Sequence, residues 1–133
     1  MNAERATYLD SSAIVKLAIV EPESAALRSY LRRRRPLVST ALARTEVGRA
    51  LAPFGATAVS RGRQVLTRIN LVRVSDRMLE AAARLPPPEL RSLDAIHLAT
   101  AQQLGASLVR VVTYDERMFA GAEAAGWTVV APT

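Results

Sequence analysis

Short runs with strand character alternate with helical segments along the chain, and this alternation constrains the fold more than any other feature. The strand-like runs lie at residues 6–9, 37–39, 69–74, 107–112 and 127–130. Segments with apolar residues at helical spacing fill the intervals between them. Strands that are joined through helices pair in parallel, and a parallel sheet needs helices on both faces. We therefore predict an α/β fold with a central parallel sheet.

Polar residues indicate where the helices begin. An N-cap side chain accepts a hydrogen bond from a free backbone N–H group in the first helical turn. The expected caps are Ser11 or Ser12, Thr40, Ser75 and Ser92. Thr40 is expected to precede a helix over residues 41–51, which ends before Pro53.

Length and composition indicate one cytoplasmic domain. The 133 residues fit a single domain over residues 1–133, and the absence of cysteine excludes disulfides and thiolate metal sites. The lack of cysteine is also compatible with a reducing cytoplasm. No apolar stretch approaches the length that spans a membrane, so we expect no membrane partner.

The charge balance favours a polyanionic partner. The chain has 18 basic and 12 acidic residues, which gives a formal net charge of +6. A positive excess attracts nucleic acid, because binding releases counterions and the long-range field steers the encounter. A preference for arginine that serves solubility explains the same excess, so charge alone does not separate the two interpretations.

Four acidic residues lie beside apolar or small residues, where a carboxylate costs free energy unless a partner stabilises it. They are Asp10, Glu46, Asp94 and Asp115. Asp10 and Asp115 directly follow expected strands, so both fall at the carboxyl edge of the sheet, where open parallel sheets bind ligands. Carboxylates that meet in one cleft repel one another, and Mg²⁺ or Mn²⁺ removes that cost.

Each acid taken singly also has a structural explanation. Asp10 and Asp115 are suitable N-caps, and Asp94 lies in a first helical turn, where the helix dipole favours negative charge. Glu46 is expected in the middle of its helix, where such an explanation is harder to find. Taken together, the four acids indicate hydrolysis of a phosphodiester. A divalent cation lowers the pKa of bound water and neutralises charge that develops on the phosphate.

Several segments carry a resemblance to a known family. They are Tyr8–Leu17, Thr45–Val47, Leu93–Ala101, Val111–Asp115 and Ala125–Val130. In this order they resemble the PIN-domain ribonucleases, and more closely the VapC toxins of type II toxin–antitoxin pairs. The resemblance covers essentially the whole chain. It implies a three-layer α/β/α sandwich, with a central parallel sheet of four or five short strands, and an endoribonuclease that depends on Mg²⁺ or Mn²⁺.

The resemblance also implies roles for the four acids. Asp10, Asp94 and Asp115 would hold the main cation, directly or through water. Glu46 would orient a metal-bound water or help to hold a second ion. The expected partners are an RNA substrate, a cognate antitoxin that covers the active site, and a second copy of the chain in a homodimer formed through helices.

Hydroxyl and basic residues near the acids complete the candidate site. Ser12 and Thr113 are expected to hydrogen-bond the carboxylates. The candidates for binding RNA phosphate are Lys16, Arg44, Arg49 and Arg91. Solvated or ion-paired roles explain these basic residues equally well.

Two further features have open or structural explanations. The run Arg32–Arg35 is compatible with phosphate binding and with a solvated helix end. His97 is the single histidine and follows Asp94 by three residues on one helix, so it can share the face of Asp94. We interpret His97 as a packing residue on an apolar stripe.

Three alternative functions are considered. A PIN-like module that binds RNA or protein without cutting would carry the same pattern. A receiver-like signalling domain also places aspartates at strand ends around Mg²⁺, but its paired acids after the first strand and its lysine after the last are missing. A metal-dependent phosphatase would need an Asp-x-Asp pattern, whereas Ser11 and Ser12 follow Asp10.

Overall fold

The computed structural model describes residues 5–133 and contains a five-stranded sheet in the order β3-β2-β1-β4-β5. The strands are β1 (Ala6–Leu9), β2 (Leu37–Thr40), β3 (Asn70–Val72), β4 (Leu108–Val112) and β5 (Val129–Val130). Every neighbouring pair is parallel, which confirms the predicted parallel sheet. The predicted single domain also includes residues 1–4, which lie outside the described residues, so its full extent stays a prediction.

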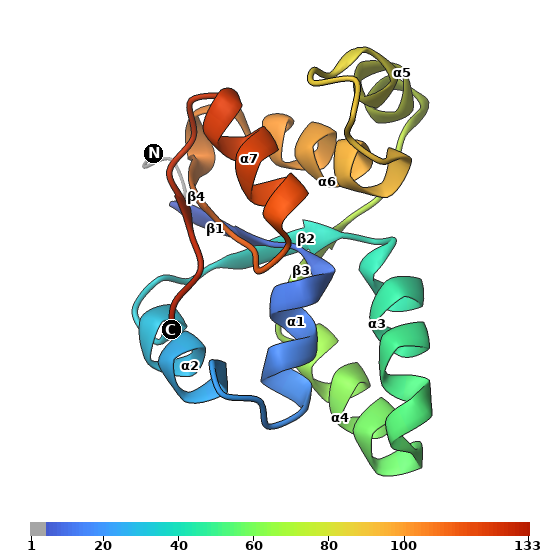
Figure 1. Ribbon diagram of the computed structural model, residues 1–133, viewed down its shortest axis with the longest axis vertical. Helices are drawn as coiled ribbons and strands as arrows, with labels where there is room; N and C mark the ends of the chain where they lie inside the picture. The colour runs from blue at the N-terminus through green and yellow to red at the C-terminus, as the bar shows by residue number, and fades with distance from the viewer. Residues whose placement is uncertain (1–4) are drawn as a thin grey trace.

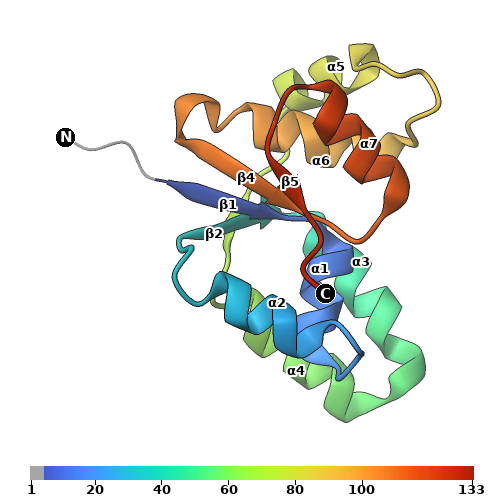
Figure 2. The ribbon, with the colours of Figure 1, turned by 60° about the vertical axis from the view of Figure 1, so that its left-hand side comes forward.

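Two layers of helices enclose the sheet. Within the described residues the helices are α1 (Ser11–Ala18), α2 (Ser24–Leu31), α3 (Ala43–Leu51), α4 (Ala56–Leu66), α5 (Asp76–Arg84), α6 (Ser92–Gln102) and α7 (Glu116–Ala124), with short 3₁₀ turns at Ala52–Phe54 and Gly105–Ser107. Figures 1 and 2 show α1 to α4 on one face of the sheet and α5 to α7 on the other. The expected three-layer sandwich is therefore confirmed. No helix in residues 5–133 has the length and hydrophobicity needed to cross a membrane.

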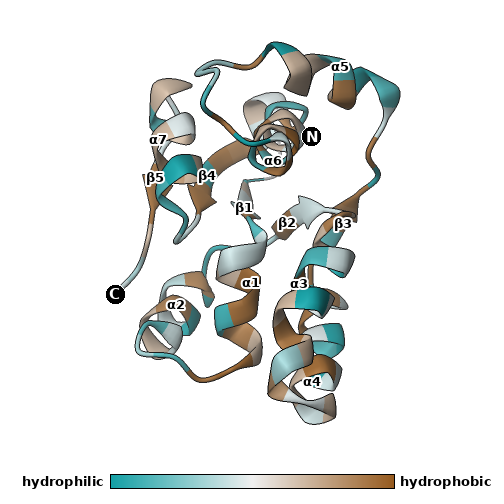
Figure 3. Ribbon diagram, turned by 45° about the vertical axis from the view of Figure 1, so that its right-hand side comes forward, coloured by the Kyte–Doolittle hydropathy of each residue, from teal (hydrophilic) through white to brown (hydrophobic). Residues whose placement is uncertain are grey.

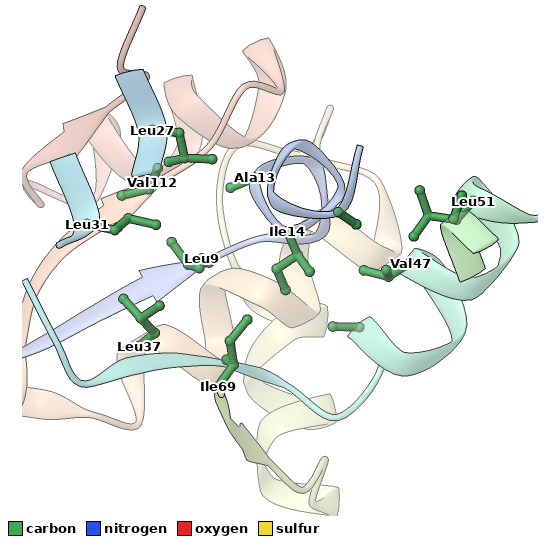
Figure 4. Close-up of a cluster of buried hydrophobic side chains, with 13 residues drawn as sticks. Leu9, Ala13, Ile14, Leu27, Leu31, Leu37, Val47, Leu51, Ile69 and Val112 are labelled. Atoms are coloured by element: carbon green, nitrogen blue, oxygen red, sulfur yellow. The ribbon is translucent and has the colours of Figure 1, made fainter. Parts of the chain in front are cut away.

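The strands supply side chains to both layers because successive residues of a strand point to opposite faces. Leu9 and Val112 pack with α1 to α4 in the larger core cluster, part of which Figure 4 shows. Tyr8 and Val111 pack on the other face against α6 and α7. In Figure 3, hydrophobic residues colour much of β2 and β4, in keeping with strands that are covered on both faces. Tyr8 therefore lies on the face of the sheet that α6 covers.

The order of the strands creates a switch point beside β1. The chain runs outward from β1 to β2 and β3, and then returns to the other side of β1 to form β4 and β5. The carboxyl ends of β1 and β4 therefore diverge into different connections at one edge, where open α/β sheets bind ligands. Asp10 follows β1 there, and its backbone N–H donates to the carbonyl of Val112 at 3.3 Å.

Some predicted helix caps are wrong. Ser75 does cap α5, since its hydroxyl accepts from the N–H of Met78 at 3.2 Å. However, Asp10 caps α1 in place of Ser11 or Ser12, because its carboxylate accepts from the N–H of Ala13.

Thr40 and Ser92 also occupy other positions than predicted. Thr40 ends β2, and α3 begins only at Ala43. Ser92 is the first residue of α6, with Arg91 at the cap position. Because α3 begins later than expected, Glu46 lies in its first turn and not in mid-helix.

Candidate functional site

Asp10 is a buried carboxylate at the end of β1, only 4 % exposed, and three donors hold it. Ser12 donates to Oδ1 at 2.6 Å, the N–H of Ala13 donates to the same oxygen at 3.1 Å, and Thr113 donates to Oδ2. Burial raises the pKa of Asp10, while the hydrogen bonds from Ser12 and Thr113 act in the opposite direction. The sequence therefore places a carboxylate at the switch point and fixes its orientation.

The two hydroxyl residues also connect the ends of β1 and β4. Ser12 Oγ accepts from the N–H of Tyr114 at 2.9 Å, and Thr113 Oγ1 accepts from the N–H of Asp115 at 3.0 Å. Each hydroxyl thus accepts from backbone after β4 and donates to Asp10. This arrangement orients Asp10 and the Asp115 segment relative to each other.

Glu46 reaches the same edge of the sheet from α3. Ser11 Oγ donates to its Oε1 at 2.8 Å, and Nε2 of His97 lies 2.7 Å from the same oxygen. Burial alone would raise the pKa of Glu46, but His97 and Ser11 together hold it below the ordinary value. Glu46 is therefore an anchored, ionised carboxylate with one oxygen occupied by protein donors.

Asp94 and Asp115 are held less firmly. Asp94 lies in the first turn of α6 and has no hydrogen-bonding partner within residues 5–133. Burial raises its pKa, and the negative charges of Asp115 and Asp10 raise it further. Asp115 caps α7, where its Oδ1 accepts from the N–H of Met118 at 2.9 Å. The charges of Asp115 and Asp10 thus act on Asp94.

The donor set fits a divalent cation that keeps part of its water shell. Among the described residues, no three His, Cys, Asp or Glu side chains form a ready metal-binding group. The acids nevertheless supply only oxygen ligands, and the charges of His97 and Arg117 offset only part of the cost that burial and the neighbouring aspartates impose on Asp94. Mg²⁺ suits such a site, since it commonly binds through one or two carboxylates and retains several waters.

His97 contacts Glu46 at this site, although the sequence analysis favoured a packing role over the face that it shares with Asp94. The residue is buried as expected, but Nδ1 lies 2.8 Å from the Tyr8 hydroxyl and Nε2 lies 2.7 Å from Glu46. The interpretation of His97 as a packing residue alone is therefore wrong. Its position one turn after Asp94 was the available signal, because that spacing directs both side chains to the same side of α6.

The basic residues that are candidates for binding RNA differ in whether they form ion pairs. Lys16 forms ion pairs with Glu21 at 3.3 Å and with Glu23 at 2.8 Å. Arg44, Arg49 and Arg91 are exposed, and no arginine of the described residues forms an ion pair with a carboxylate. These three arginines are thus free to meet an anion, whereas Lys16 would first have to leave its acidic partners.

The arginine run lies away from the carboxylates. Arg34 stacks over the ring of Tyr30, 3.9 Å from its centroid. Arg32 and Arg35 line a hollow of about 290 Å³ together with Arg28, Arg68 and apolar residues. Leu37, the first residue of β2, also lines this hollow, which places it at the opposite end of the strand from the acids.

Comparisons with known proteins agree with this architecture. A family model described as PIN domain matches residues 7–124. The ribonuclease VapC46 of Mycobacterium tuberculosis is 59% identical over 128 residues, which cover 96% of this chain and 98% of that protein. The crystal structure of VapC20 from the same species, a sarcin-ricin loop cleaving toxin, matches with a TM-score of 0.72 at 20% identity over 95% of this chain and 99% of the other. A toxin–antitoxin complex from Klebsiella pneumoniae matches with a TM-score of 0.70 at 24% identity, covering 96% of this chain and 98% of that one. The two structural matches show a shared fold.

Proposed function

Because this chain belongs to the PIN-domain family and to its VapC group, we propose that it is a divalent-cation-dependent endoribonuclease, the toxin of a toxin–antitoxin pair. The observation that supports the proposal is the placement of acidic side chains around the switch point. Asp10 and Asp115 follow β1 and β4 there, and Ser11, next to Asp10, donates to Glu46. The charges of Asp115 and Asp10 act on Asp94. Burial and the negative charges of Asp115 and Asp10 raise the pKa of Asp94, and a bound cation would relieve that cost. A relative named a ribonuclease at 59% identity supports the assignment of RNA as substrate.

The four acids have two roles in the proposed reaction, cation binding and orientation of the attacking water. Asp10, Asp94 and Asp115 would hold Mg²⁺ or Mn²⁺, which lowers the pKa of bound water and neutralises charge on the scissile phosphate. Ser12 and Thr113 keep both oxygens of Asp10 oriented. Glu46 remains ionised and anchored at Oε1, so its second oxygen is available to orient the attacking water.

RNA and protein partners follow from the same proposal. The exposed residues Arg44, Arg49 and Arg91 would contact the RNA backbone, since they flank the acids and lack carboxylate partners. Lys16 would join them only after release from Glu21 and Glu23. A cognate antitoxin and a homodimer in the cytoplasm complete the proposal, and the complex from Klebsiella pneumoniae supports the antitoxin by its shared fold.

Cleavage of total RNA tests the proposal. Purified protein is incubated with RNA in Mg²⁺, in Mn²⁺ and in EDTA, alongside Asp94→Asn and the control Asp76→Asn, an exposed acid of α5. We expect cleavage with either cation by wild type and Asp76→Asn, and none in EDTA or with Asp94→Asn. RNA binding without cleavage under every condition would favour the non-catalytic PIN-like module.

A thermal shift tests the cation site without RNA. A ligand that binds only the folded state stabilises it by RT ln(1 + [L]/Kd), about 2.7 kcal/mol when the free cation exceeds Kd a hundredfold. Millimolar Mn²⁺ is expected to raise the Tm of the wild-type protein and to raise that of Asp94→Asn less. Identical melting curves with and without Mn²⁺ would contradict the proposed site.

A further inference from the structure

A buried chain of hydrogen bonds runs from the middle of the sheet to Glu46. It begins at Tyr8 of β1, continues through His97 of α6 and ends at Glu46 of α3, with heavy-atom distances of 2.8 and 2.7 Å. The Tyr8 ring meets the His97 ring edge-on, with centroids 5.9 Å apart. Tyr8 is fully buried and His97 is 3 % exposed, so water does not compete for the contact between them. Glu46, at the other end, keeps 22 % of its side chain exposed.

The partners assign the hydrogens along this chain. Burial raises the pKa of Tyr8, so its hydroxyl keeps the proton that it donates to Nδ1 of His97. Glu46 is ionised and only accepts, so Nε2 of His97 carries the hydrogen that faces Oε1. Tyr8 thus fixes the tautomer of His97 that donates toward the carboxylate edge.

The chain also joins parts of the molecule that packing alone would leave independent. Helices α3 and α6 lie on opposite faces of the sheet, and His97 connects them (Figure 2). Ser11, next to Asp10, donates to the same Oε1 of Glu46 at 2.8 Å. With two donors on Oε1, the carboxylate has a fixed orientation and a second oxygen without a protein donor in residues 5–133.

We propose that His97, held by Tyr8, is a positioning residue that orients Glu46 for the proposed phosphodiester cleavage. This inference rests on the proposed nuclease function and adds to it a residue outside the four acids. His97 does not itself touch the substrate. It acts by keeping Oε1 of Glu46 turned toward the protein and the other oxygen turned toward the site.

The matched pair His97→Gln and His97→Asn tests this role. The amide nitrogen of Gln reaches about the position of Nε2 and can donate to Glu46, whereas the shorter Asn reaches only the position of Nδ1. We expect His97→Asn to lower kcat by about 10–100-fold, as for other residues that orient a ligand, with KM for RNA unchanged. His97→Gln is expected to restore most of kcat. Equal activity of the two variants would overturn the proposal.

NMR of the metal-free protein gives a readout that does not depend on activity. His97 is the only histidine, so its ring nitrogens give single, assignable ¹⁵N signals. We expect hydrogen on Nε2, a shift of the Nε2 signal in Glu46→Gln and a shift of the Nδ1 signal in Tyr8→Phe. Ring signals that neither substitution moves would overturn the proposed chain of hydrogen bonds.

The two arms separate failure of the inference from failure of the proposed function. If wild type cuts no RNA with either cation, the nuclease proposal fails, and the NMR experiment alone decides whether His97 orients Glu46.

If circular dichroism shows that His97→Asn does not fold, Tyr8→Phe replaces it in the activity assay. Tyr8→Phe keeps the ring packing but loses the donor to Nδ1, and it is expected to lower kcat with KM unchanged. Wild-type kcat in Tyr8→Phe would then overturn the role of the chain.

Discussion

The carboxylate site consists of two halves that are supported differently. Asp10 and Glu46 form an anchored half, in which each carboxylate accepts two or more hydrogen bonds from the protein. Asp94 and Asp115 form an open half, in which Asp94 has no donor within residues 5–133 and Asp115 has one. The difference shows that protein donors orient the first pair, whereas the second pair has few protein donors, so the proposed cation would offset its repulsion.

Loss of one charge in either half should have the largest effect. Asp10→Asn and Asp115→Asn are each expected to lower the rate of RNA cleavage by more than about 100-fold, since even residues that merely orient a ligand cost up to that much. Single-turnover cleavage in Mn²⁺ measures the effect. Glu116→Gln is the matched control, because Glu116 is adjacent to Asp115 but exposed. An active Asp115→Asn protein would show that the open half is dispensable.

Removal of a donor should weaken the anchored half selectively. Thr113→Val keeps the shape of the side chain but removes the hydroxyl that donates to Asp10. Cation affinity or cleavage is expected to fall by about 10–100-fold. Thr7→Val is the control, because Thr7 is equally buried and its hydroxyl instead accepts from Arg110 at 2.6 Å. If both variants lose the same activity, the effect belongs to packing and not to the orientation of Asp10.

Neutralisation of Asp94 should stabilise the metal-free protein. Its folded-state pKa is raised by burial and by Asp115, so ionised Asp94 lowers stability above that pKa. This cost disappears as pH falls through the raised folded pKa toward the pKa of the unfolded chain. Tm in EDTA is therefore expected to rise on acidification through this window, with a smaller rise in Asp94→Asn. Thermal melts in EDTA at several pH values measure the difference between wild type and Asp94→Asn, and parallel pH profiles of Tm would contradict the prediction.

Substitution of arginines beside the anchored half should have the smallest effect. Arg44→Ala is expected to weaken RNA binding and to reduce the slope of log K against log salt by about 0.7 for each lost phosphate contact. Binding is measured with the inactive Asp94→Asn protein at several salt concentrations. Arg84→Ala, an exposed arginine of α5, has the same net charge and is expected to keep the wild-type slope. Equal salt slopes for Arg44→Ala and Arg84→Ala would show that Arg44 does not contact RNA phosphate.

The open half was easier to predict from sequence than the supports of the anchored half. Asp115 follows a strand signal and precedes a helix signal, and both are local patterns. Asp10 was identified in the same way. Because the strands pair in parallel, the carboxyl ends of β1 and β4 lie at the same edge of the sheet. Local patterns therefore placed most strands and helices and the edge of the sheet at which Asp10 and Asp115 lie.

The contacts that support Glu46 depend on packing that local patterns do not specify. His97 and Glu46 are 51 residues apart in sequence and come from helices on opposite faces of the sheet. The wrong caps have a related cause: at β1 the buried Asp10 takes the N-cap role, while Ser12 turns its hydroxyl to Asp10 and to the N–H of Tyr114. Competition among nearby polar groups is settled by tertiary structure, which a single sequence does not show.

The placement of charge at opposite ends of β2 gives the molecule an electrical polarity along its strands. The arginine-lined hollow lies at one end and the cluster of acids at the other. A polyanion that approaches the cation-free protein is drawn toward this hollow and repelled by the acids, although the exposed Arg44, Arg49 and Arg91 beside the acids oppose that repulsion. In the proposed nuclease, a bound cation would offset that repulsion, so we expect the cation to bind first and the RNA second.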